Sequence, residues 1–152
     1  MRTASSSFRV LAAAAILAVS GCSMMQPQRE DDHLAAFSTR MTGMNEVPAV
    51  ATTATGTVDA VLDKQTNLLR WKMSFNNLSG PATMAHFHGP AAIGANAGVV
   101  LPFKAPVASP YEGRATLTAQ QAADLLAGKW YVNVHTAKNP AGEIRGQMIE
   151  RK

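Results

Sequence analysis

The stretch Met84–Pro90 reads MAHFHGP, and the fold and the candidate site are both organised around it. In an extended strand, successive side chains point to opposite faces of the sheet. His86 and His88 therefore share one face with Met84, while Phe87 lies on the other. Two imidazoles are thus expected to stand side by side on the polar face of a half-buried strand.

A second stretch, residues 130–136, alternates in the same way and reads WYVNVHT. Its tryptophan and two valines form an apolar face, which leaves Tyr131, Asn133 and His135 on the polar one. If the two strands are neighbours in one sheet, three of the four histidines of the chain can converge on a single ion. If they are not neighbours, these histidines are unrelated surface residues.

The chain is long enough for one domain with its own core, and its 152 residues are 47% hydrophobic and 16% charged. Short alternating runs separated by glycine, proline and asparagine recur along it, at 35–41, 56–62, 69–75, 84–88, 99–103, 113–117, 130–136 and 143–149. Thr118 and Gln121 form a capping-box pattern that predicts one short helix, ended by Gly128. We therefore expect an all-β fold, an antiparallel Greek-key-like sandwich of about seven or eight strands with one short helix. The small residues of 91–98 are expected to form a mobile surface loop.

The N-terminal residues 1–21 have the pattern of an export signal, with a basic start and an apolar run too short to span a bilayer permanently. The following Val19–Cys22 resembles the bacterial lipobox, in which the cysteine becomes the lipid-bearing N-terminus. Cys22 is the only cysteine of the chain, and the alternative is an ordinary secretory signal with an incidental cysteine. We expect residues 22–34 to be a flexible tether and 35–150 to be the folded domain.

Ser23 follows the cysteine, which resembles the sorting pattern for outer-membrane delivery. The expected location is therefore the outer membrane, on its periplasmic or surface side, with the lipid bilayer as a partner through Cys22. The net charge of +4 does not indicate nucleic-acid binding, because the basic residues form no clustered patch.

Six blocks along the chain are specific enough to identify a family resemblance. They include an Asn-Glu-x-Pro turn at residues 45–48, the Ala-His-Phe-His-Gly run at 85–89, Tyr-Val-Asn-Val-His-Thr at 131–136 and Gly-Glu-Ile-Arg-Gly-Gln at 142–147. Together they resemble the CHRD domain, the module named after chordin and found in many bacterial exported proteins. The resemblance covers about residues 35–150 and implies an exported module, but it does not transfer the signalling role of the animal protein.

The histidine pattern predicts a transition-metal site formed by His86, His88 and His135, with Met84 as a soft additional ligand. Imidazole suits copper and zinc, and the thioether favours copper over zinc. Glu143 lies just beyond the hairpin turn that follows His135, and we expect it to orient the His135 imidazole without binding the ion itself. The layout is also similar to copper/zinc superoxide dismutase, although the additional histidines and the aspartate of that zinc site are missing.

Three alternatives remain. The histidines can be purely structural. The same polar face can bind an envelope protein or a glycan without catalysis, through Tyr131, Asn133, Arg145 and Gln147. A third alternative is a copper-dependent redox enzyme of the dismutase kind. Catalysis is disfavoured because the histidine strands offer no positioned acid, base or nucleophile apart from Glu143.

Overall fold

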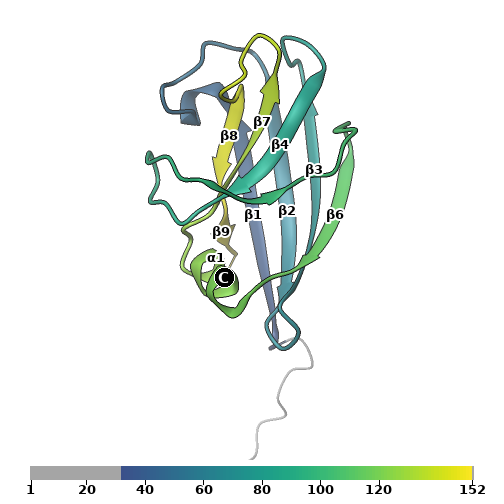
Figure 1. Cartoon of the computed structure of the whole chain (residues 1–152), viewed down its shortest axis with the longest axis vertical. Coiled ribbons are helices and arrows are strands. Elements are labelled where there is room, and N and C mark those ends of the chain that lie inside the picture. The colour runs from purple at the N-terminus through teal and green to yellow at the C-terminus, as the bar shows by residue number, and fades with distance from the viewer. Residues whose placement is uncertain (1–31, 152) are drawn as a thin grey trace, which may run out of the picture.

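Nine β-strands form most of the regular backbone in residues 32–151, the part of the chain that the computed structural model describes (Figure 1). In chain order the strands are β1 (Leu34–Thr42), β2 (Thr55–Asp63), β3 (Leu68–Asn76), β4 (Ala82–His88), β5 (Val99–Pro102), β6 (Tyr111–Thr116), β7 (Tyr131–Thr136), β8 (Ile144–Gln147) and β9 (Ile149–Glu150). A 3-10 turn η1 (Gly43–Asn45) follows β1, and one helix α1 (Ala119–Leu126) precedes β7. The predicted signal segment 1–21, Cys22 and tether residues 22–31 lie outside this range.

The strands form a single antiparallel sheet in the order β5-β4-β7-β8-β1-β2-β3-β6, with β9 paired to β1. The sheet curls around its apolar side, so that the fold is sandwich-like (Figure 1). This confirms the prediction of an all-β antiparallel fold with one short helix. The strand count is one more than expected because the last run is split into β8 and β9 around the buried Met148.

The alternating residues of the long strands form the core inside the curl. In β3, for example, Leu69, Trp71 and Met73 are buried, whereas Arg70 and Lys72 between them are exposed. The same period of two places Phe87 in the core. Burial of such side chains, at roughly 25 cal/mol per Å² of apolar surface, is the main stabilising contribution to a domain of this size.

The helix is capped as its sequence predicts. The Thr118 hydroxyl accepts a hydrogen bond from the Gln121 backbone N–H, and the Gln121 side chain accepts one from the Thr118 N–H. Gly128 follows the helix with φ of +68°, a conformation that favours glycine. Within residues 32–151, no helix combines the length and the apolar character needed to cross a membrane.

Strands β4 and β7 are direct neighbours, which is the condition on which the metal hypothesis depends. In their antiparallel ladder Met84 lies opposite His135, His86 opposite Asn133 and His88 opposite Tyr131. Strand β8 continues the sheet on the other side of β7 and pairs Asn133 with Arg145. The histidines therefore lie on the face of the sheet that points away from the core.

Candidate metal centre

His86, His88 and His135 come together on the outer face of β4 and β7, as the sequence predicts. One ring nitrogen from each lies within 4.8 Å of those of the other two. Their ring centroids are 4.8 Å apart for His86 and His135, and 5.5 Å for His86 and His88. His88 and His135 are only 8% and 5% exposed, while His86 is half-buried at the edge of the cluster.

Backbone carbonyls hold the two buried imidazoles by their Nδ1 atoms. Nδ1 of His88 lies 3.0 Å from the Ala97 oxygen, and Nδ1 of His135 lies 3.0 Å from the Pro140 oxygen. A carbonyl can only accept, so each Nδ1 donates and each neutral ring has its lone pair at Nε2. This is the tautomer that a histidine needs in order to bind a metal through Nε2.

Both Nε2 atoms face the same amide oxygen. Oδ1 of Asn133 lies 3.0 Å from Nε2 of His88 and 2.9 Å from Nε2 of His135. The Asn133 amide is oriented by its Nδ2, which donates to the Ala141 oxygen at 3.5 Å. When both rings are neutral, the two Nε2 lone pairs and the amide oxygen converge, and none of these three atoms carries a proton of its own.

The pKa values of two of these histidines are lowered, which favours their neutral form. Burial, followed by the charges of His135 and His88, lowers the pKa of His86 to about 4. Burial also lowers the pKa of His135, and the bond to Pro140 offsets this only in part. A cation bound by the Nε2 atoms of His88 and His135 and by Oδ1 of Asn133 would place a positive charge among these electron-rich atoms. Imidazole nitrogen and amide oxygen are atoms that transition metals accept as ligands, so this group of atoms fits such an ion.

Met84 lies at the rim of this cluster. It stands directly opposite His135 in the ladder, and 46% of its surface is exposed. The structure thus places the thioether in the strand position next to His86 on the same face, and its role as a ligand stays a prediction.

The expected role of Glu143 is wrong, because the Pro140 carbonyl takes the position behind His135. Glu143 is fully buried and accepts four hydrogen bonds, from the Thr52 hydroxyl (2.8 Å), the Ser79 N–H (2.9 Å), the Ser79 hydroxyl (2.6 Å) and the Thr136 hydroxyl (2.7 Å). Burial raises its pKa, but these hydrogen bonds outweigh burial and lower the pKa to about 2. Glu143 therefore joins the loops that carry Thr52 and Ser79 to the end of β7 as a carboxylate, and it does not contact the histidines.

The surface loop expected at residues 91–98 is anchored to the sheet by hydrogen bonds from Arg145, and its mobility stays a prediction. Arg145, only 2% exposed, donates from Nη1 to Asn96 Oδ1 (2.8 Å) and from Nη2 to the Ala95 oxygen (2.6 Å). Its guanidinium also lies 3.4 Å from the centroid of the Tyr131 ring. The loop supplies the Ala97 carbonyl that holds His88, so Arg145 positions the histidine cluster indirectly.

The same contacts bury most of the residues through which the polar face was expected to bind an envelope protein or a glycan. Tyr131, Asn133 and Arg145 are 3%, 3% and 2% exposed. These residues lie under the loop, and Gln147 bonds to the backbone of Ala91 and Gly128. They do not form the open polar face that such a module requires.

Sequence reasoning missed Glu46, which lies on the far side of Asn133 from the histidines. Glu46 is 8% exposed, and its Oε1 has no hydrogen-bond partner among residues 32–151. Burial raises its pKa to about 7, although the charge of Arg145 and a hydrogen bond with Asn133 act in the opposite direction. Gly142, which has φ of +131°, lies beside the contact between Glu46 and Asn133. A Cβ at this position would lie 2.7 Å from Asn133 Nδ2, so the absence of a side chain leaves room for that contact.

The comparisons with known proteins agree with the sequence resemblance. The family model described as the CHRD domain matches residues 37–148, a span that includes β4, β7 and all three clustered histidines. Comparison with curated proteins and with solved structures gives no significant match.

Proposed function

Because this chain belongs to the CHRD domain family, and because three of its histidines meet on one face of the sheet, we propose that it binds a transition-metal ion, with copper favoured over zinc. The ligands in this proposal are His86, His88 and His135. Asn133 Oδ1 completes the set from within the cluster, and Met84 approaches from the rim.

The observation that carries the proposal is the shared contact of two imidazoles with Asn133. His88 and His135 together have four ring nitrogens, and each lies within 3.0 Å of an oxygen acceptor. Two neutral imidazoles have only two N–H groups, so two of these contacts join a lone pair to an oxygen. A buried arrangement of this kind is costly unless a positive charge is bound, and a metal ion at the two Nε2 atoms provides one.

Calorimetric titration of the purified full-length protein with Zn(II), Cu(II) and Cu(I) tests the proposal. We expect one ion per chain for the wild type and none for a triple His86→Ala, His88→Ala, His135→Ala variant. His33→Ala is the matched control, because His33 lies outside the cluster. Wild-type protein that binds none of the three ions would reject the proposal.

The preference for copper rests on Met84, since thioether sulfur selects soft ions. We expect Met84→Leu, which preserves size and apolar character, to lower the affinity for Cu(I) and to leave that for Zn(II) unchanged. Equal affinity for Cu(I) in both proteins would remove methionine from the ligand set.

We also propose that the protein is held at the outer membrane through lipidated Cys22. The lipobox-like sequence before Cys22 and the serine after it support this location. Metabolic labelling with a radioactive fatty acid tests it. Wild-type protein should incorporate label and a Cys22→Ala variant should not, whereas an unlabelled wild type would indicate an ordinary secreted domain.

A further inference from the structure

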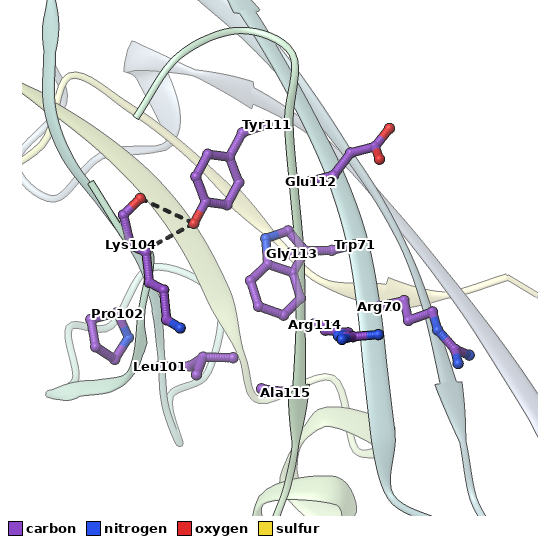
Figure 2. A pocket seen from close by; sticks show the side chains of 10 residues that line it. All are labelled: Arg70, Trp71, Leu101, Pro102, Lys104, Tyr111, Glu112, Gly113, Arg114 and Ala115. Carbon is purple, nitrogen blue, oxygen red and sulfur yellow. Dashed lines mark hydrogen bonds between the residues drawn. The ribbon is translucent and has the colours of Figure 1, made fainter. Parts of the chain in front are cut away.

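A second site lies at the two ends of the curled sheet, away from the histidines. Strands β5 and β6 end the strand order, and a cavity of about 670 Å³ lies between them (Figure 2). Its lining comes from both end strands, from β3 and from the connection between β5 and β6, namely Arg70, Trp71, Leu101, Pro102, Lys104, Tyr111, Glu112, Gly113, Arg114 and Ala115. Its volume lies within the ~300–1,000 Å³ that is usual for ligand sites.

Each of the two end strands that border this cavity, β5 and β6, has one unpaired edge. Among residues 32–151, β5 pairs only with β4, and β6 pairs only with β3. The tyrosine hydroxyl of Tyr111 bonds to the Lys104 N–H and oxygen at 2.8 and 3.2 Å, so a side chain fixes the connecting segment beside the cavity (Figure 2). The free edge of β6 is six residues long and presents backbone donors and acceptors that another strand can use.

The inner wall of the cavity is apolar. The indole of Trp71 extends beneath Gly113 of β6, where any Cβ would collide with it, and it packs on Phe103 with ring centroids 5.1 Å apart. Phe103 in turn stacks on Tyr111. Because Gly113 has no side chain, the indole reaches the edge strand, where it can contact an apolar side chain of an added strand.

The outer rim is positively charged. Arg70 and Arg114 are directly opposite each other on β3 and β6, and like charges in such cross-strand positions destabilise a sheet. Neither forms an ion pair within the described residues, and Lys104 adds a third positive charge. The only acidic residue of the lining, Glu112, lies 3.2 Å from Lys72. The two arginines thus lack a counter-charge that a ligand can provide.

We propose that this opening binds an extended acidic peptide segment of a partner protein, which pairs with the free edge of β6. Side chains of a strand alternate between faces. A segment with alternating acidic and apolar residues places the carboxylates beside Arg70 and Arg114 and the apolar groups against Trp71. The backbone bonds provide affinity, and the alternation provides specificity.

The first measurement is binding of a fluorescently labelled, end-blocked hexapeptide, Glu-Val-Glu-Val-Glu-Val, to the purified full-length protein. A peptide with proline in place of valine keeps the charge but lacks half of the backbone N–H groups, and proline disfavours pairing in a ladder. We expect the proline peptide to bind at least about tenfold more weakly. Hydrogen exchange should show new protection of residues 111–116 by the first peptide only.

The second measurement uses Arg114→Glu, which places an opposite charge across from Arg70 and therefore does not threaten the sheet. We expect it to weaken peptide binding at least about tenfold, while the matched Arg40→Glu on β1 leaves binding unchanged. Equal binding of the two peptides, protection outside β6, or an unaffected Arg114→Glu variant would overturn the proposal. Absence of peptide binding, or a site that takes octanoate in place of the peptide, would also overturn it.

Discussion

Nδ1 of His86 lies 3.1 Å from Nε2 of His135, so these two imidazoles share one hydrogen bond. His135 donates from its Nδ1 to Pro140, and its Nε2 therefore accepts from His86. The atom that would bind a metal in His135 is thus occupied by a neighbouring ligand residue. The metal ion proposed above would have to replace this hydrogen bond with a stronger interaction at the same nitrogen.

The three histidines should contribute unequally to metal affinity. His88 and His135 are buried and held by carbonyls, whereas His86 is half-buried and its ring bonds only to His135 among the described residues. Pre-oriented ligands lose less freedom on binding. We expect His88→Ala and His135→Ala each to lower Zn(II) affinity by about 100-fold, and His86→Ala by about tenfold. Titration calorimetry measures this, and three equal losses would contradict the role of pre-orientation.

Asn133 should control the strength of the site. Asn133→Asp places a carboxylate between the two Nε2 atoms, and we expect it to raise Zn(II) affinity by about tenfold or more. Asn133→Leu removes the oxygen and should lower the affinity by a similar factor. The control is Asn76→Asp, which adds the same charge at the exposed end of β3. If both Asn133 variants bind Zn(II) as the wild type does, the amide is not part of the ligand set.

Glu143→Gln should destabilise the fold without affecting the metal site. Four donors converge on this carboxylate, and an amide NH₂ would face some of them, so we expect a loss of about 2–3 kcal/mol in the free energy of unfolding at pH 7. Zn(II) affinity should stay unchanged, because Pro140 orients His135. A folded variant with weakened Zn(II) binding would restore the role that the sequence suggested.

The same residue should make wild-type stability fall in acid. The pKa of Glu143 is about 2 in the folded protein, below the ordinary value of 4.5. The unfolded chain therefore binds the proton more tightly, and the contribution of Glu143 is present above pH 4.5 and is lost as pH falls towards 2. Urea unfolding across this range should show the decline in the wild type, and a shallower one in Glu143→Gln.

Side-chain periodicity predicted the strands and the face on which the histidines lie, and the capping-box pattern of Thr118 and Gln121 predicted the start of the helix. It could not determine that β4 and β7 are neighbours, because alternation assigns a face to each residue but does not pair strands. The ladder that places His86 opposite Asn133 settles this point.

The partners of the histidines were beyond the reach of the sequence for a different reason. Pro140 and Ala97 act through their carbonyl oxygens, which every residue has, so residue type carries no signal for them. Arg145 was recognised as polar, but its burial depends on the loop of residues 89–98 folding over it. Glu143 was placed behind His135 because the two residues flank one hairpin turn, whereas two other loops and the end of β7 supply the donors to its carboxylate.

Glu46 should make the metal-free protein less stable as pH rises. Its pKa is raised from 4.5 to about 7 by burial, so the folded state binds this proton more tightly than the unfolded state. Its stabilising contribution is therefore complete below pH 4.5 and is lost as pH rises through 7. Glu46→Gln keeps the shape of the protonated acid, and at pH 8 we expect it to be more stable than the wild type by about 3 kcal/mol. At pH 4 the two proteins should have nearly equal free energies of unfolding.

Urea unfolding in the presence of a chelator measures the stability difference at both pH values, with Glu112→Gln as the control for charge removal on the exposed face. A variant that is less stable than the wild type at pH 8 would mean that Glu46 is held as a carboxylate by Arg145, and that burial does not dominate its pKa.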